Sequence, residues 1–277
     1  QNMHLIGDHV GFADLSQWIG LDDDTGKGWQ RVKSKIYGRV ELPEKILPYP
    51  FQNECIAAAK DYCGEPENNR GKIILPCGTG KSLLGFWISQ ELAARNVLLV
   101  VPSLTLVSQI LRTWTDQSVA HGVDLDWFAV CSDKSVGKDR QDQLVSSTYD
   151  LGIPCSTDVD EIAAWLSEDS TGTKLTVTTY NSGPALAEAA RKVGLSFDLA
   201  IMDEAHKTVG DREKRFGHLL DDANLDAKHR LFMTATERVW RGDKDSVNTM
   251  NDPAVYGNLI YQMSFKAAIE AGVICDY

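Results

Sequence analysis

The sequence predicts an α/β fold in which a central, mostly parallel sheet is flanked by helices. Short apolar runs that indicate buried strands alternate along the chain with stretches of helical periodicity, as in stacked strand–helix–strand units. The run NVLLVVPS (96–103) is almost continuously apolar, as expected for a strand that is buried on both faces of a parallel sheet. Polar motifs directly follow several of these runs, at the strand ends where parallel sheets bind ligands.

Helices are expected where apolar residues recur at helical spacing between turn signals. Pro50 opens the first helix, Asp158 is a candidate N-cap residue, and Gly194 ends a later helix. The expected helices cover 51–63, 83–92, 104–114, 158–168 and 183–194. The expected strands, each with the polar turn that it enters, cover 73–75, 96–103, 126–133, 174–182, 197–206 and 229–237. A strand-like piece, a helix and a final run close the chain.

We expect the chain to have two parts. Residues 1–47 carry few motifs, and three prolines lie close together in GRVELPEKILPYP (38–50), so this part is expected to be an N-terminal extension or a linker from a preceding domain. Residues 48–277 carry all the motifs described below. They are long enough to form one large domain with a single core.

The composition is that of an ordinary globular protein, with 43% hydrophobic and 24% charged residues. A net charge of −11 argues against a passive nucleic-acid binder with a wholly basic surface, but a local groove that grips phosphates with backbone N–H groups and hydroxyls stays open. Six scattered cysteines without a CxxC pair favour reduced thiols in a cytoplasmic protein over disulfides or a zinc site. No apolar run reaches membrane-spanning length, so no membrane partner is expected.

The segment KIILPCGTGKS (72–82) has the order strand, glycine turn, Lys-Ser and helix that is typical of a phosphate-binding loop. Gly78 and Gly80 would let backbone N–H groups close on phosphate oxygens, and the following helix would direct its N-terminus at the anion. Lys81 would reach the β- and γ-phosphates, and the Ser82 hydroxyl would hold Mg²⁺. The candidate residues of this loop are Cys77, Gly78, Thr79, Gly80, Lys81 and Ser82.

The second strong motif is IMDEAH, in which an apolar strand runs into Asp203 and Glu204. A phosphate loop needs such acidic residues: Asp203 would hold the Mg²⁺ shell, largely through water, and Glu204 would orient and activate the attacking water. A surface acidic turn is the simpler alternative, but both motifs in this order make nucleotide hydrolysis the better interpretation. For His206 we expect a relay contact between Glu204 and the Thr-Ala-Thr turn at 234–236 rather than metal binding, because no second histidine has a ligand-like spacing.

Five motifs in this order resemble the first motor domain of superfamily 2 DEAD/DEAH-box-like helicases and translocases: GTGKS, VPSLTLVSQ, TTYNS, DEAH and TAT. PCGTGKS, VCSD, MNDPAVYG and the ending SFKAAIEAGVICDY narrow the resemblance to restriction-associated "predicted helicases", which include type I and type ISP restriction enzymes. The resemblance covers the chain from about residue 48 onward. It implies a RecA-like P-loop NTPase domain, with ATP and Mg²⁺ as cofactors.

The resemblance also implies roles for individual residues. Gln52 would read the adenine, although an ordinary helix-surface residue is an equally good interpretation. Thr234 and Thr236, with His206, would couple hydrolysis to strand binding. Two turns would touch the nucleic-acid backbone, through Ser103, Leu104, Thr105, Thr179, Tyr180 and Asn181. For Thr179 and Tyr180 a purely structural role is the alternative, because β-branched and aromatic residues are common in strands.

Two departures from the family pattern stand out. Leu75 occupies the place of the first glycine of the general phosphate loop, a glycine that this superfamily often lacks, and Glu237 replaces the proline of the commoner TATP. Such motors also need a second RecA-like domain with arginines that complete the ATP site. Since no such domain follows in this chain, the chain by itself is expected to hydrolyse ATP poorly.

The leading hypothesis is an ATP-driven motor domain that acts on nucleic acid, with duplex DNA in a restriction or phage-defence enzyme as the favoured case. Nuclease or methyltransferase domains or subunits are the expected partners. The alternative is a nucleotide-gated module that binds nucleic acid or a protein without translocating. A guanine-nucleotide switch is disfavoured, because the sequence has no Asn-Lys-x-Asp guanine reader. These residues leave DNA versus RNA open.

Overall fold

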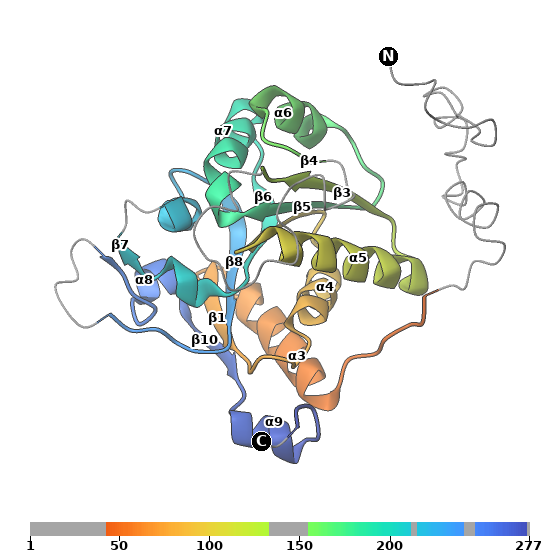
Figure 1. Ribbon diagram of the computed structural model, residues 1–277, viewed down its shortest axis with the longest axis vertical. Coiled ribbons are helices and arrows are strands. Elements are labelled where there is room, and N and C mark those ends of the chain that lie inside the picture. Colours follow the sequence, from red (N-terminus) through yellow and green to blue (C-terminus); the bar gives the residue numbers. More distant parts are fainter. Residues whose placement is uncertain (1–42, 133–154, 212–214, 241–246, 276–277) are drawn as a thin grey trace, which may run out of the picture. The chain divides into compact units, whose positions relative to one another are not determined.

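The computed structural model describes residues 43–132, 155–211, 215–240 and 247–275 (Figure 1). Most of the expected extension 1–47, and the last residue of the expected strand segment 126–133, lie outside these ranges. A compact unit begins at Glu44 and contains every candidate motif. Across the described ranges, no helix combines the length and the apolar composition that crossing a membrane requires.

A sheet of eight strands forms the centre of this unit, and every strand pair in it is parallel. The strand order is β10-β1-β8-β6-β2-β5-β3-β4. The strands are β1 (Arg70–Ile74), β2 (Asn96–Val101), β3 (Leu125–Val130), β4 (Cys155–Ser156), β5 (Thr173–Thr179), β6 (Phe197–Met202), β8 (Ala227–Thr234) and β10 (Asn258–Gln262). The predicted α/β class with a parallel sheet is confirmed.

The helices begin close to the positions that the sequence indicates, except that no helix was expected at 253–256. They are α3 (Pro50–Gly64), α4 (Lys81–Glu91), α5 (Leu104–His121), α6 (Val159–Ser167), α7 (Gly183–Val193), α8 (Pro253–Tyr256) and α9 (Phe265–Glu270). The expected N-cap of α6 is present, because the Asp158 side chain accepts hydrogen bonds from the backbone N–H groups of Asp160 and Glu161. Helix α5 runs well past its expected end at residue 114, and a left-handed Gly122 (φ +68°) caps it.

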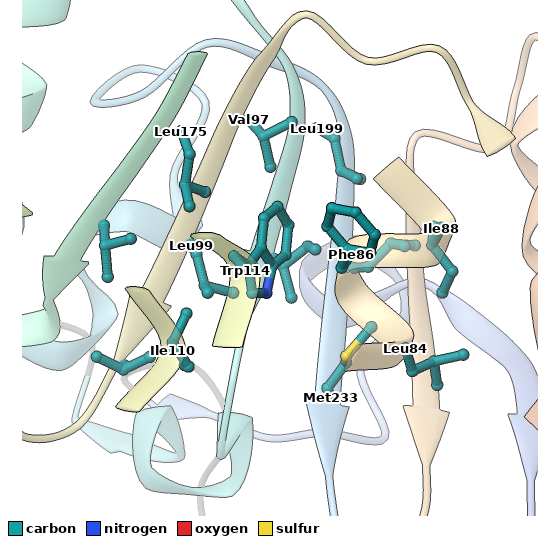
Figure 2. Close-up of a cluster of buried hydrophobic side chains, with 14 of the residues drawn as sticks. Leu84, Phe86, Ile88, Val97, Leu99, Ile110, Trp114, Leu175, Leu199 and Met233 are labelled. Atoms are coloured by element: carbon teal, nitrogen blue, oxygen red, sulfur yellow. The ribbon is translucent and has the colours of Figure 1, made fainter. Parts of the chain in front are cut away.

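The two faces of the sheet carry separate hydrophobic clusters. Residues of β2 alternate between them, with Val97 and Leu99 in one cluster and Leu98 and Val100 in the other. Helices α3, α4 and α5 cover the first face, where Trp114 lies fully buried beside side chains of α4 (Figure 2). Helices α6 and α7 cover the second face (Figure 1). The sheet is therefore buried on both sides, as expected for a parallel α/β domain.

The strand register brings the motifs to one edge of the sheet. The last residue of β1 pairs with Thr234 of β8, and Val101 at the end of β2 pairs with Thr179 of β5. Strand β6, which precedes Asp203, lies between β8 and β2. The phosphate loop, the DEAH residues and the two polar turns therefore leave adjacent strands at their carboxyl ends.

A second, two-stranded antiparallel sheet was not expected from the sequence. Strand β7 (Gly210–Asp211) pairs with β9 (Val247–Asn248). Each strand has only two residues, which is too short for a periodic apolar pattern to be recognised. The pairing joins the segment after the DEAH motif to a segment that follows the Thr-Ala-Thr turn.

Candidate nucleotide site

The phosphate loop connects β1 to α4 through two glycines in the left-handed backbone region. Gly78 has φ +83° and Gly80 has φ +76°, conformations that L side chains rarely adopt. Helix α4 begins at Lys81, directly after Gly80. Inside the turn, the Thr79 hydroxyl donates a hydrogen bond to the Pro76 carbonyl over 2.7 Å. The two glycines and this hydrogen bond therefore define the shape of the loop, with the N-terminus of α4 at its end.

Gln52 links α3 to the phosphate loop. Its side chain is 1% exposed, and its Nε2 donates to the Thr79 carbonyl over 2.9 Å. Its Oε1 accepts from the backbone N–H of Tyr49 over 2.8 Å. This burial excludes the alternative of an ordinary helix-surface residue. Adenine recognition by Gln52 stays a prediction.

Lys81 lies between the loop backbone and Glu204. Its Nζ is 3.4 Å from the carbonyl oxygens of both Leu75 and Pro76, and 3.9 Å from Glu204 Oε1. The Lys81 side chain is only 9% exposed. These contacts are long, so the ammonium group has hydrogen-bonding capacity left for an anionic ligand in the loop.

Asp203 and Glu204 follow β6 and have different environments. Asp203 is 7% exposed, and burial raises the pKa of its carboxyl group from 3.8 to about 6. The Glu204 carboxylate is more exposed, and its contact with His206 holds its pKa below the ordinary value. Glu204 also has a left-handed backbone (φ +48°, ψ +44°), which is uncommon for a residue with a side chain. Such strain concentrates at functional sites.

Replacing Asp203 with asparagine is expected to stabilise the metal-free chain at pH 7.5. Because the carboxyl pKa is raised from 3.8 to about 6 in the fold, ionisation of Asp203 destabilises the folded state. This penalty is complete above about pH 6 and disappears as the pH falls toward 4. Asparagine keeps an acceptor for the Glu204 N–H, which lies 2.9 Å from Asp203 Oδ1. We expect a gain of roughly 2–3 kcal/mol in the free energy of unfolding by urea at pH 7.5, shrinking toward zero near pH 4. An equal gain at both pH values would contradict the assigned cause.

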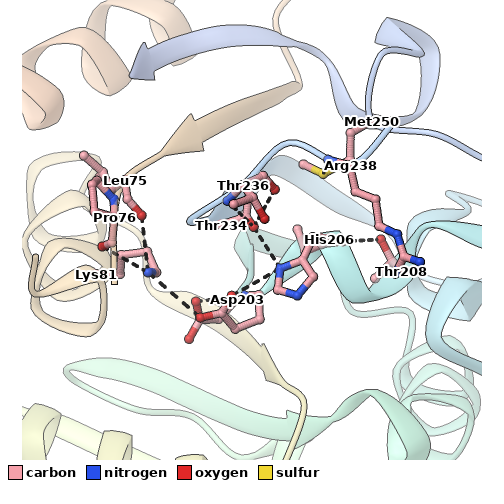
Figure 3. A network of polar contacts seen from close by, with 12 residues as sticks. Leu75, Pro76, Lys81, Asp203, His206, Thr208, Thr234, Thr236, Arg238 and Met250 are labelled. Atoms are coloured by element: carbon pink, nitrogen blue, oxygen red, sulfur yellow. Dashed lines mark hydrogen bonds and ion pairs between the residues drawn. The ribbon is translucent and has the colours of Figure 1, made fainter. Parts of the chain in front are cut away.

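His206 contacts both Glu204 and the Thr-Ala-Thr turn, and Figure 3 shows it beside Thr234. Its Nδ1 lies 3.3 Å from Glu204 Oε2 and 3.0 Å from the Thr234 hydroxyl. The Thr234 hydroxyl in turn donates to the Thr236 carbonyl over 3.0 Å. The relay contact expected of His206 is therefore present. The backbone N–H of Leu75 also donates to the Thr234 carbonyl over 2.9 Å, so the turn contacts the phosphate loop directly.

The two turns that were expected to contact nucleic acid differ in exposure. Ser103 and Thr105 are partly exposed at the start of α5, where the Ser103 side chain caps the helix, whereas Leu104 is 4% exposed. Thr179 and Tyr180 are 0% and 1% exposed. The side chains of these three residues are thus buried, and their contact with nucleic acid stays a prediction.

The remaining residue of these turns, Asn181, is partly exposed. Contact of Ser103, Thr105 and Asn181 with nucleic acid stays a prediction.

Two buried contacts near the site were not foreseen. The Tyr180 hydroxyl donates to the backbone carbonyl of Asp203 over 2.7 Å, and the Trp114 indole N–H donates to the carbonyl of Ser82 over 3.0 Å. Both side chains support the backbone of a candidate residue from another element. A buried Tyr or Trp needs a hydrogen-bond partner, but the sequence does not show which backbone group supplies it.

The residues fit a nucleotide with Mg²⁺. The left-handed glycines and the start of α4 make the anion-binding arrangement described above, and Ser82 and Asp203 offer the hydroxyl and carboxylate oxygens that Mg²⁺ prefers. Asp203 is a desolvated carboxylate with a raised pKa, and a bound divalent cation would offset the unfavourable burial of its charge.

This fold and this site define the first RecA-like motor domain of a superfamily 2 helicase or translocase. Residues 45–238 match the family described as "Type III restriction enzyme, res subunit". The chain belongs to that family.

Relatives and solved structures agree with this class. A probable helicase of African swine fever virus (a tick isolate from Malawi) is 29% identical over 228 residues, which are 82% of this chain and 23% of the viral protein. One similar solved structure is a nuclease-deletion mutant of the type ISP restriction-modification enzyme LlaGI in complex with a DNA substrate mimic. It is 25% identical to this chain and has a TM-score of 0.64, and the match covers 82% of this chain and 21% of that one. The DNA-bound, ATP-dependent type ISP enzyme LlaBIII has the same fold, with 24% identity and a TM-score of 0.71 over 87% of this chain and 17% of that one. The chain thus spans less than a quarter of each of these proteins.

Proposed function

We propose that this chain is the ATP-binding motor domain of an enzyme that couples ATP hydrolysis to movement on nucleic acid. The position of Glu204 is the main support for this proposal. Its Oε1 lies 3.9 Å from Lys81 Nζ, and its Oε2 lies 3.3 Å from His206 Nδ1. One carboxylate thus joins the phosphate loop to a histidine that contacts the Thr234 hydroxyl. A group that orients the attacking water needs this kind of link if hydrolysis is to respond to events elsewhere in the domain.

The candidate residues divide the work of hydrolysis. Lys81 and the N–H groups of the loop bind the β- and γ-phosphates and stabilise the charge that develops on them. Ser82 and Asp203 would hold Mg²⁺, largely through water, and the ion would neutralise phosphate charge. Glu204 orients the water and accepts its proton.

The other candidate residues have supporting roles. Gln52 reads the adenine and holds the loop, and His206, Thr234 and Thr236 couple the site to nucleic acid. Ser103, Thr105 and Asn181 contact the nucleic-acid backbone.

We further propose that the nucleic acid is duplex DNA and that the full-length protein is a cytoplasmic restriction or phage-defence enzyme. The similarity to the DNA-complexed type ISP enzyme LlaGI supports this choice. A second RecA-like domain of the full-length protein completes the ATP site, so the isolated domain hydrolyses ATP poorly. Nuclease or methyltransferase domains or subunits act with the motor.

A triplex-displacement assay on the full-length protein tests translocation. We expect ATP-dependent displacement of a third strand from duplex DNA, because a motor that translocates along the duplex displaces a third strand bound in its path. The same preparation should hydrolyse ATP faster with duplex DNA than with single-stranded DNA or RNA. Nucleotide-dependent DNA binding without displacement would instead support the rival function, a nucleotide-gated binding module.

A further inference from the structure

Lys72 is a buried lysine at the start of the phosphate-loop segment, and no role has yet been assigned to its side chain. It lies on β1, three residues before Leu75, and is 8% exposed. Its Nζ donates to Glu237 Oε1 over 2.6 Å and to the Met250 carbonyl over 2.7 Å. Glu237 directly follows the Thr-Ala-Thr turn, and its side chain is 37% exposed.

Stability alone is a poor explanation of the pair. Burying the Lys72 ammonium group is costly, and water screens its attraction to Glu237, whose side chain is 37% exposed, so the pair is expected to add little to stability. A buried lysine with two defined partners does, however, fix the positions of those partners, since leaving its charge unpaired is strongly unfavourable. The arrangement is therefore better explained by the geometry that it imposes.

The pair holds the exit of the Thr-Ala-Thr turn. The entry of the turn is held at Thr234, whose hydroxyl contacts His206 and whose carbonyl accepts from Leu75 N–H. Lys72 holds the other end through Glu237.

Lys72 also reaches the segment that follows the turn. The backbone N–H of Met250 donates to the Arg238 carbonyl over 3.2 Å. Strand β9 lies just before Met250 and pairs with β7. Strand β7 in turn follows the 3-10 helix Ala205–Thr208, which carries His206. Lys72 thus connects the phosphate-loop strand β1 to the Thr-Ala-Thr turn, which carries Thr234. Through Met250 and the β7–β9 pair it also connects β1 to the segment that carries His206.

We propose that Lys72 and Glu237 are a positioning pair that transmits nucleic-acid binding to the ATP site through the Thr-Ala-Thr turn. Where the commoner TATP has a proline, whose ring fixes the backbone φ, this chain fixes the exit of the turn with an ion pair to β1. The inference rests on the proposed function, because it concerns the coupling of the same site. In the described part of the chain, the hydrogen bonds and ion pair of Lys72 and Glu237 do not involve Lys81, Ser82, Asp203 or Glu204, so the pair acts on stimulation rather than on basal turnover.

A double-mutant cycle tests the pair in the full-length protein. Glu237→Gln removes one charge, Lys72→Met removes the other while keeping an unbranched side chain, and the double variant removes both. We expect each single variant to lose most of the several-fold DNA stimulation of kcat, and the double variant to lose no more of it. Basal turnover and the KM for ATP should stay within about twofold of the wild-type values. Glu91→Gln, which breaks the exposed Lys60–Glu91 pair between α3 and α4, is the matched control and should change neither rate.

The outcomes separate the inference from the proposed function. Three results would show that the pair is merely structural and would overturn the inference. They are equal losses of basal and stimulated turnover, additive effects of the two substitutions, and a lowered Tm with normal stimulation. If wild-type turnover is not stimulated by any nucleic acid, the proposed function fails, and the inference fails with it. Stimulated wild-type turnover with unaffected variants overturns the inference alone.

Discussion

Lys81→Ala and Glu204→Gln are each expected to lower ATP turnover by the full-length protein about a hundredfold or more, because each removes a positioned charge or base. The two substitutions should differ in nucleotide binding. Lys81→Ala removes the ammonium group that binds the phosphates and weakens ATP binding. Glu204→Gln keeps the shape of the side chain, leaves ATP binding largely intact and lowers kcat alone. Steady-state hydrolysis with saturating duplex DNA, combined with titration of a fluorescent ATP analogue, measures both effects.

Matched controls for these variants come from an exposed ion pair on the neighbouring helices. Lys60 and Glu91 have side chains that are 57% and 42% exposed, so Lys60→Ala and Glu91→Gln repeat the same chemical changes in solvent. Both controls should keep wild-type turnover. Hydrolysis that survives in either site variant would refute the assigned mechanism.

Gly257→Ala is expected to destabilise the fold by roughly 3–5 kcal/mol, from backbone strain together with overpacking. Gly257 ends α8 with φ +69° and ψ −171°, a region essentially restricted to glycine. A Cβ atom at this position would lie 1.8 Å from the carbonyl oxygen of Arg70, where β1 begins. The next residue, Asn258, pairs with Gly71, so relief of the clash would disrupt the pairing of β10 with β1. Urea unfolding of the purified chain measures the loss.

Gly194→Ala is the matched control for the strain alone. Gly194 also has a positive φ (+65°), but no atom outside its immediate neighbours lies within 4 Å of a Cβ built on it. Only the left-handed backbone is penalised there, so a loss of about 1 kcal/mol is expected. Similar losses for the two variants would mean that the close approach of Gly257 to Arg70 does not matter for stability.

Much of the fold was predictable because its elements have local causes. The apolar run of β2 indicated a strand that is buried on both faces, and its residues do alternate between two hydrophobic clusters. The Asp158 N-cap and the left-handed Gly194 mark helix ends that side chains or backbone dihedrals define locally. The convergence of the motifs followed from the rule that ligands bind at the carboxyl ends of parallel strands.

What could not be predicted depends on contacts between distant parts of the chain. Tyr180 was assigned to a nucleic-acid-binding turn, yet its ring is buried and its hydroxyl donates to the Asp203 carbonyl. The partners of Lys72 lie 165 and 178 residues further along the chain. Strands β7 and β9 are stabilised by their pairing rather than by their own propensity. A local pattern contains no information about such partners.

We propose that Lys81, Asp203 and Glu204 form one half of an ATP site whose turnover responds to nucleic acid. The most direct test is the steady-state rate of ATP hydrolysis by the full-length protein, with and without duplex DNA, compared with the rate of its Glu204→Gln variant. We expect wild-type hydrolysis to rise several-fold with DNA and hydrolysis by the variant to fall to background. A wild-type rate that DNA does not change, or a variant that hydrolyses ATP like the wild type, would show that these residues do not form such a site.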